Sequence, residues 1–103
     1  MPRLVVVRTT MPDEASARRL AQRLIDGRLA ACAHVQPVFS TYLWKGTRHG
    51  ETEWFVEART RILREGALRR ALREGHPYEV PVVESWWTAV DADYAAWAKA
   101  QTK

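Results

Sequence analysis

Short apolar runs alternate along this chain with stretches whose apolar residues recur at helical spacing. The first run, Leu4 to Val7, lies inside the segment Arg3 to Thr10 and predicts a buried central strand. Pro12 and Asp13 then supply a helix start with a capping carboxylate, and Gly27 predicts its end. The face of this helix predicted to be buried comprises Ala17, Leu20, Ala21, Leu24 and Ile25.

The segment from Cys32 to Thr60 is predicted to form one long β-hairpin, around which the rest of the chain is organised. Both arms are rich in β-branched and aromatic residues, and Lys45-Gly46 with His49-Gly50 provides turn chemistry between them. We expect residues near 39–44 to pair with residues near 51–56. Pro37 predicts a bulge or an edge strand, because proline has no amide hydrogen to donate.

The first arm, from about residue 31 to 44, is longer than the roughly five or six residues of a typical strand. Such an arm should extend beyond its own subunit, where its unpaired edge can find a partner chain.

The remaining segments complete an alternating order of strands and helices. Residues 63–74 predict a second helix that ends at Gly75, and a proline-bounded turn runs from His76 to Pro81. A strand from Val82 to Trp87 and a last helix beginning near Asp91 or Asp93 follow. The order β-α-β-β-α-β-α predicts an α+β, ferredoxin-like fold: a four-stranded antiparallel sheet, helices on one face, and an extra C-terminal helix. Residues 1–103 are expected to form a single domain.

Composition narrows the function classes. The net charge of +4 comes from 16 basic and 12 acidic residues spread along the chain, which favours a solvated surface and makes nucleic acid a minor alternative. No apolar run is long enough to predict a membrane span, and the first run is unlike a signal peptide. A single cysteine, Cys32, excludes an intrachain disulfide, so we expect a cytoplasmic protein.

Metal binding is the chemistry that the residues suggest most directly. Cys32 and His34 are two residues apart, which on a regular strand aims a thiolate and an imidazole to one face, a soft pair suited to copper or zinc. Two ligands do not complete a site, so His76, Glu53 or a neighbouring subunit would have to contribute. The alternatives are a buried thiol beside an unrelated histidine, and a His76 that holds its turn by hydrogen bonds.

Catalysis has little support in the sequence. The chain has no nucleophile elbow and no glycine-rich phosphate loop, so a thiol–imidazole enzyme would depend on tertiary contacts of Cys32 alone. We therefore expect a protein that is not an enzyme and has no organic cofactor.

Taken together, the motifs resemble the divalent-cation tolerance protein CutA family along nearly the whole chain. The resemblance rests on Thr10-x-Pro12-Asp13-Glu14-x-x-Ala17, Leu29-Ala30-Ala31-Cys32, Ser40-x-Tyr42-x-Trp44-x-Gly46, Glu53 with Arg59-Thr60, His76-Pro77-Tyr78-Glu79-x-Pro81, and Tyr94-x-x-Trp97. It implies a homotrimer built through the long hairpin, an architecture similar to the PII-like proteins, and a role in tolerance of copper and other divalent cations.

From this resemblance and the residues, we expect a metal to use His76, Cys32 and His34, with copper favoured, and Tyr42 and Trp44 to pack in the trimer. The alternative function is a PII-like sensor of a small anion or metabolite in a cleft between subunits. Its cleft would comprise Thr10, Glu53, Arg59, Tyr78 and Glu79.

The chain departs from the family pattern at three places. Arg59 stands where the family usually has lysine, which replaces a point charge by a planar fork of donors. Val82 stands where the family typically has glutamate, and Ser85-Trp86-Trp87 replaces an apolar turn with proline. The missing glutamate weakens the case for a carboxylate-rich cleft.

Overall fold

The computed structural model describes residues 1–103 and confirms the predicted order of elements. The strands are β1 (Arg3–Met11), β2 (Cys32–Trp44), β3 (Thr47–Thr60) and β4 (Glu84–Ala89). The helices are α1 (Glu14–Asp26), α2 (Glu65–Arg73), which a short 3-10 turn at Ile62–Arg64 precedes, and α3 (Ala92–Gln101).

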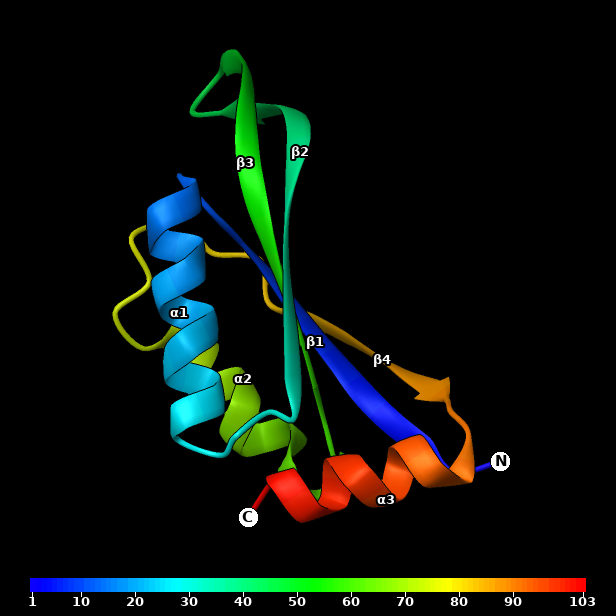
Figure 1. The fold of residues 1–103 in the computed structure, drawn as a ribbon. Helices are drawn as coiled ribbons and strands as arrows, with labels where there is room; N and C mark the ends of the chain where they lie inside the picture. Colours follow the sequence, from blue (N-terminus) through cyan, green and yellow to red (C-terminus); the bar gives the residue numbers. More distant parts are fainter.

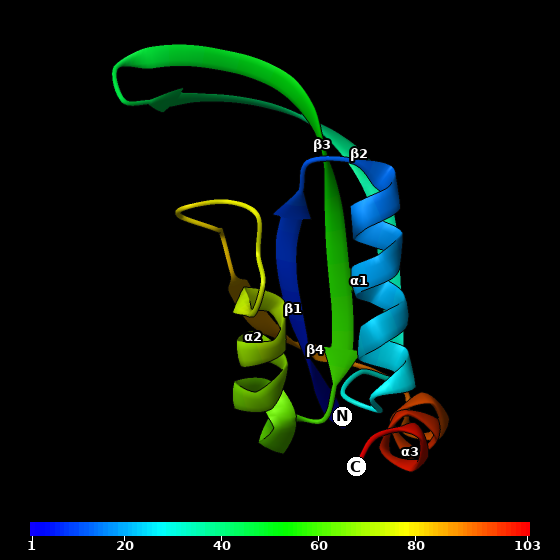
Figure 2. The same ribbon diagram turned by 90° about the vertical axis from the view of Figure 1, so that its left-hand side faces the viewer.

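One antiparallel sheet with the order β2-β3-β1-β4 holds all four strands (Figure 1). The apolar first strand is central, as its sequence predicts. Helices α1 and α2 lie side by side on one face of the sheet (Figure 2). This arrangement is the α+β, ferredoxin-like fold that the sequence predicts.

The core lies between the two helices and the sheet. Asp13 caps α1 by accepting a hydrogen bond of 2.7 Å from the Ser16 amide, and the α1 side chains Ala17, Leu20 and Leu24 are buried. Leu68 and Leu72 of α2 are equally buried. These side chains pack against alternate residues of the sheet, among them Val5, Val7, Val56 and Ala58. Burial of these apolar faces is the main force that holds the helices on the sheet.

The hairpin spans the predicted residues, Cys32 to Thr60, but its turn is tighter than predicted. The turn consists of Lys45 and Gly46 alone, both with positive φ (51° and 82°), the backbone that a two-residue type I′ turn requires. Residues 39–44 therefore pair with 47–52, and the predicted pairing with 51–56 was wrong. Gly50 lies within β3, where the Phe39 ring is close to it: an added Cβ there would meet the ring at 3.3 Å.

Pro37 marks an edge strand and no bulge. Strand β2 is at the edge of the sheet, and its pairing with β3 runs without interruption from Val35 opposite Val56, through Pro37 opposite Trp54, to Phe39 opposite Thr52. On an edge strand, the missing amide hydrogen leaves no partner unsatisfied.

The outer half of the hairpin projects past the end of α1 and bends over the rest of the chain (Figures 1 and 2). The molecule measures 46 × 25 × 21 Å with a radius of gyration of 14.3 Å, above the roughly 13 Å of a compact chain of this length. Phe39 and Leu43 on this projection are 70% and 73% exposed. The prediction that the arm extends beyond the body is thus confirmed.

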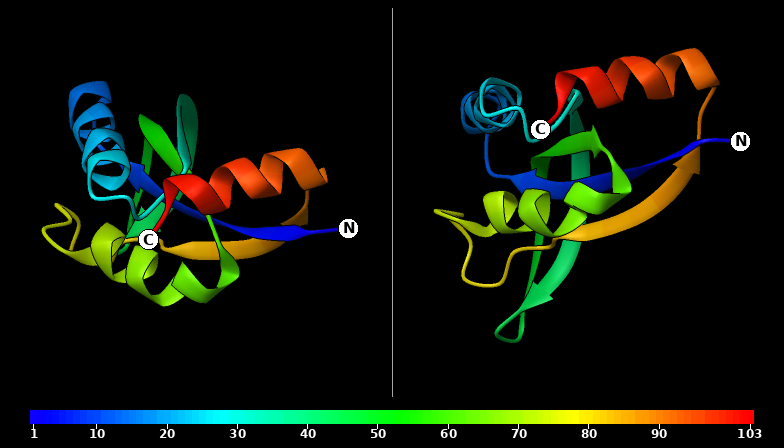
Figure 3. Two further views of the ribbon diagram at one scale, coloured as in Figure 1. Left: turned by 60° about the horizontal axis from the view of Figure 1, so that its bottom comes forward. Right: turned by 90° about the horizontal axis from the view of Figure 1, so that it is seen from below.

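The C-terminal region is anchored at the opposite end of the sheet (Figure 3). Ala98 of α3 packs against Leu4 and Ala31, and Arg28 donates hydrogen bonds to the carbonyl groups of Ala100 and Gln101 at 2.8 and 3.2 Å. No helix has the length and apolar character that a transmembrane span needs.

The segment before α3 differs from the sequence prediction at its start. Strand β4 begins at Glu84, because the Val82 carbonyl accepts a hydrogen bond from the Thr9 hydroxyl at 2.6 Å and belongs to the loop. Arg69 of α2 holds this segment by donating to the Ser85 hydroxyl and the Val83 carbonyl, both at 2.9 Å.

Candidate functional site

The face of the sheet opposite α1 and α2, called the open face here, carries most of the candidate residues. Residues directly opposite one another on paired strands share a face. One row across the strands consists of Cys32, Arg59, Val6 and Trp86, and the next consists of His34, Glu57, Arg8 and Glu84.

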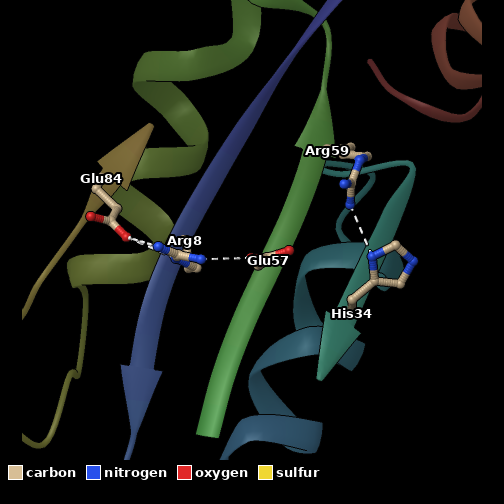
Figure 4. A network of polar contacts seen from close by, with 5 residues as sticks. All are labelled: Arg8, His34, Glu57, Arg59 and Glu84. Atoms are coloured by element: carbon tan, nitrogen blue, oxygen red, sulfur yellow. Dashed lines mark hydrogen bonds and ion pairs between the residues drawn. The ribbon is translucent and has the colours of Figure 1, made fainter. Parts of the chain in front are cut away.

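Arg8 lies at the centre of the open face between two carboxylates (Figure 4). Its guanidinium group is 3.0 Å from Glu57 and 2.6 Å from Glu84. The Phe55 and Trp86 rings lie 4.2 and 5.0 Å from the guanidinium carbon, so the cation is held between aromatic faces as well as between charges. Arg8 is thus committed to the sheet and is not free for a ligand.

Arg59 and His34 are in contact beside this network (Figure 4), and Cys32 extends the chain of contacts from His34. Arg59 Nη1 lies 2.9 Å from His34 Nδ1, and His34 Nε2 lies 3.5 Å from Cys32 Sγ. A guanidinium group can only donate, so Nδ1 must accept and the ring proton of neutral His34 is on Nε2, facing the sulfur. The Tyr94 side chain lies beside the same sulfur, and burial together with Cys32 raises the pKa of its phenol.

His76 lies elsewhere, where it attaches the loop between α2 and β4 to β1. Its Nδ1 accepts from the Tyr78 amide at 3.1 Å, and its Nε2 lies 3.0 Å from the Thr9 hydroxyl and 3.1 Å from the Thr10 carbonyl. The Thr9 hydrogen is already donated to Val82, so Nε2–H is the donor toward Thr9 and Thr10. Burial lowers the pKa of His76, which keeps the imidazole neutral.

Within one chain, His76 does not meet Cys32 or His34. No three histidine, cysteine, aspartate or glutamate side chains come together as a metal site. Any metal on the Cys32–His34 pair would take its remaining ligands from solvent or from a neighbouring subunit.

A hollow of about 620 Å³ lies under the projecting hairpin. Its walls come from the hairpin, the end of β1 and the 76–82 loop: Thr10, Ser40, Thr41, Tyr42, Trp44, Glu53, Pro77, Tyr78, Glu79, Val80 and Val82. The predicted cleft residues Thr10, Glu53, Tyr78 and Glu79 are brought together here, and Arg59 is not among the lining residues. Tyr42 and Trp44, predicted for trimer packing, line the same hollow.

The carboxylates of β3 have partners other than Arg59. Glu51 accepts a hydrogen bond from Tyr42, Glu53 accepts one from Tyr78 at 2.7 Å, and Glu57 pairs with Arg8. Sequence reasoning also missed Arg8. Its position alternating with Val7 on β1 was a usable signal, but only the strand register places it between Glu57 and Glu84.

Comparison with known proteins gives a consistent result. Residues 5–101 match the family described as CutA1 divalent ion tolerance protein. The divalent-cation tolerance protein CutA of Citrobacter koseri is 36% identical over 105 residues, which cover 100% of this chain and 91% of that protein. The CutA protein of Salmonella newport has the same identity and coverage.

Solved structures agree over the same length. The Pyrococcus horikoshii CutA structure superposes with a TM-score of 0.92 at 32% identity, covering 96% of this chain and 99% of that one. The CutA1 structure from Oryza sativa gives a TM-score of 0.90 at 30% identity, covering 98% and 94%. Sequence and fold together show that this chain belongs to the CutA1 divalent ion tolerance protein family.

Proposed function

We propose that the protein is a homotrimer of single-domain subunits that binds copper or another divalent metal through Cys32 and His34 and takes part in tolerance of such ions, without catalysing a reaction. The observation that carries the proposal is the distance of 3.5 Å between Cys32 Sγ and His34 Nε2. The curated relatives are named for divalent-cation tolerance, which supports the same assignment.

The separation of these two atoms fits one metal ion. Typical bonds of about 2.3 Å to sulfur and 2.0–2.1 Å to nitrogen, at a tetrahedral angle, put the two donor atoms roughly 3.5 Å apart. A thiolate and an imidazole form a soft donor set, which favours copper or zinc over magnesium or calcium. With two ligands from each chain, we expect binding to be weak unless a second subunit contributes.

Arg59 opposes this binding. A metal on His34 Nε2 must replace the proton there, and the neutral ring then carries its proton on Nδ1, where it would face the Arg59 donor at 2.9 Å. Arg59 therefore has to release His34 before the metal binds. Arg59 therefore affects the metal affinity of Cys32 and His34 although it is not itself a ligand.

Trimer formation is supported by surfaces that one chain leaves uncovered. β2 and β4 are both edge strands, and the hairpin projects beyond the core. Trp86 on the open face is 40% exposed, and Phe39 and Leu43 on the projecting hairpin are 70% and 73% exposed. Unpaired strand edges together with exposed aromatic side chains are typical of surfaces that a second copy covers.

The alternative function, a sensor of a small anion or metabolite, has weaker support than metal binding. Within one chain, no arginine or lysine lines the hollow that holds the predicted cleft residues. The compartment stays a prediction: the sequence favours the cytoplasm, whereas the CutA protein of Archaeoglobus fulgidus, which shares this fold at 24% identity, is described as periplasmic.

Anaerobic calorimetric titration with copper(I) and with zinc(II) tests the metal proposal. His34→Gln should weaken metal binding at least about tenfold, because one of the two protein ligands is lost. Arg59→Gln should tighten binding, because the competing hydrogen bond is removed. His49→Gln, which changes a histidine of the hairpin outside the pair, is the matched control and should bind as the wild type does. Equal affinity of wild type and His34→Gln would refute the assignment.

A further inference from the structure

We propose that the hollow under the hairpin is a binding site for a small organic ammonium ion, with Glu53 as its charge partner. The inference is separate from the metal proposal, which concerns the other end of β3. It rests on a buried charge, on the aromatic walls around it, and on the absence of cationic side chains from the lining.

Glu53 is the unusual group of the hollow. It is only 8% exposed, and its one hydrogen bond is the 2.7 Å contact between Oε2 and the Tyr78 hydroxyl. None of the ion pairs of the chain includes it. Buried carboxylates are normally paired with a cation, because a lone charge out of water is costly. The hollow therefore presents a negative charge that lacks its counterpart.

The neighbouring phenol donates a hydrogen bond to one oxygen of this carboxylate. Burial and the hydrogen bond to Glu53 raise the pKa of Tyr78, so the phenol stays protonated and donates. The bond to Tyr78 uses Oε2 of Glu53, and no hydrogen bond within the chain uses Oε1, so this oxygen can accept one from a ligand. The His76 ring behind Tyr78 is neutral and adds no positive charge.

The walls suit the body of an organic cation. Tyr42, Trp44 and Tyr78 line the hollow together with Val82. Aromatic faces attract ammonium groups, and a volume of about 620 Å³ is within the usual range for a small-molecule site. The hydrogen bond to Glu51 raises the pKa of Tyr42 to about 12, so this second phenol also remains uncharged.

Other ligand classes fit less well. A divalent metal would need three or more donors, and no such group of side chains exists. An anion would meet Glu53 and Glu79 with no basic residue in the lining, because Lys45 lies outside and is 3.7 Å from Glu79. The charge, the volume and the aromatic lining of the hollow together favour a ligand with an ammonium group attached to an apolar or aromatic group.

The test uses three probes of the same shape on the assembled protein: benzylammonium, benzyl alcohol and benzoate. Affinities come from calorimetry, and the indole signal of Trp44 in nuclear magnetic resonance spectra reports the location. Benzylammonium should bind at least about tenfold more tightly than either other probe, the usual effect of one charged hydrogen bond. Equal affinities, a preference for benzoate, or no binding of benzylammonium would overturn the proposal. Absence of binding overturns it also where a side chain of a second copy fills the hollow.

Two variants locate the charge. Glu53→Gln should reduce benzylammonium affinity about tenfold, to the level of benzyl alcohol. Glu57→Gln, on the same strand and face but outside the hollow, should leave benzylammonium affinity within twofold of wild type. Retained selectivity in Glu53→Gln, or an equal loss in Glu57→Gln, contradicts the site. If Glu53→Gln does not fold, the ranking of the three probes on the wild type decides alone. Copper and zinc titrations of the same samples judge the metal proposal separately.

Discussion

The three histidines show how neighbours decide what a residue can do. His34 has its Nδ1 occupied by Arg59 and its proton turned to Cys32, whereas His76 has both nitrogens engaged by the backbone and by Thr9. His49 stacks on Tyr42 with ring centroids 5.2 Å apart. Spacing in the sequence correctly suggested that Cys32 and His34 share a face. The contact with Arg59 could not be predicted, because it depends on the register between β2 and β3.

His76 should make stability depend on pH in a defined direction. Burial lowers its pKa in the folded chain below the ordinary value of 6.5, so below that pH the unfolded chain takes up a proton that the folded chain resists. The stability that neutral His76 provides is therefore present above about pH 6.5 and is lost as the pH falls toward the folded pKa.

Urea denaturation between about pH 7.5 and 5.5 measures this effect. The wild-type midpoint should fall more over this range than that of His76→Gln, whose amide can donate and accept without titrating. The carboxylates affect both proteins alike and cancel in the comparison. Parallel curves for the two proteins would show that His76 does not contribute.

Among the elements, the helices were predicted well and the hairpin only in outline. Asp13 and Gly27 bound α1 as the sequence indicates, because capping and termination are local. The hairpin register was missed because the sequence offers two pairs that could form the turn, Lys45-Gly46 and His49-Gly50. In the structure only Lys45 and Gly46 have the positive φ of the two-residue turn, whereas Gly50 lies within β3 opposite Thr41.

Substitution of two glycines, Gly46 in the turn and Gly66 in α2, should change the free energy of unfolding in opposite directions. Gly46 has φ +82°, so Gly46→Val should destabilise the hairpin by about 1–2 kcal/mol, the usual cost of a left-handed residue with a β-carbon. Gly66 lies in α2, where an added Cβ would make only an ordinary contact of 3.6 Å with the flexible Arg70 side chain, and Gly66→Ala should stabilise the protein by up to about 1 kcal/mol.

Chemical denaturation gives the sign at each site, and hydrogen exchange of residues 42–49 tests whether the Gly46 effect is confined to the hairpin. Protection of these amides should fall in Gly46→Val and stay unchanged in Gly66→Ala. A neutral Gly46→Val would mean that the turn relaxes into another type.

On the scale of the whole molecule, the fold followed from the order and spacing of apolar residues, because every element of the core obeys its local period. The functional regions did not follow in the same way. The hollow combines the hairpin, β1 and the 76–82 loop, and its charge depends on two carboxylates, Glu79, which pairs with Lys45, and Glu53, which has no ion pair.

Assembly is the prediction that belongs to this scale. Light scattering behind gel filtration should give the mass of three chains at micromolar concentration, because the hairpin and open face leave apolar surface that water disfavours. Arg48→Gln, at an exposed polar position of the hairpin, serves as a surface control that should remain trimeric. A monomeric wild type would contradict the trimer and remove the subunit clefts on which a shared metal site depends.

The unbroken pairing of β2 with β3 also limits how the hairpin can evolve. Adding one residue to each arm would leave the pairing intact but turn the Lys45-Gly46 tip to the opposite face of the sheet, since side chains alternate along a strand. Adding two to each arm would preserve the face and carry the tip about 7 Å farther. Arm length in relatives of this fold should therefore change in steps of two residues per strand, and chimeras that break this parity should lose the hollow while keeping the core.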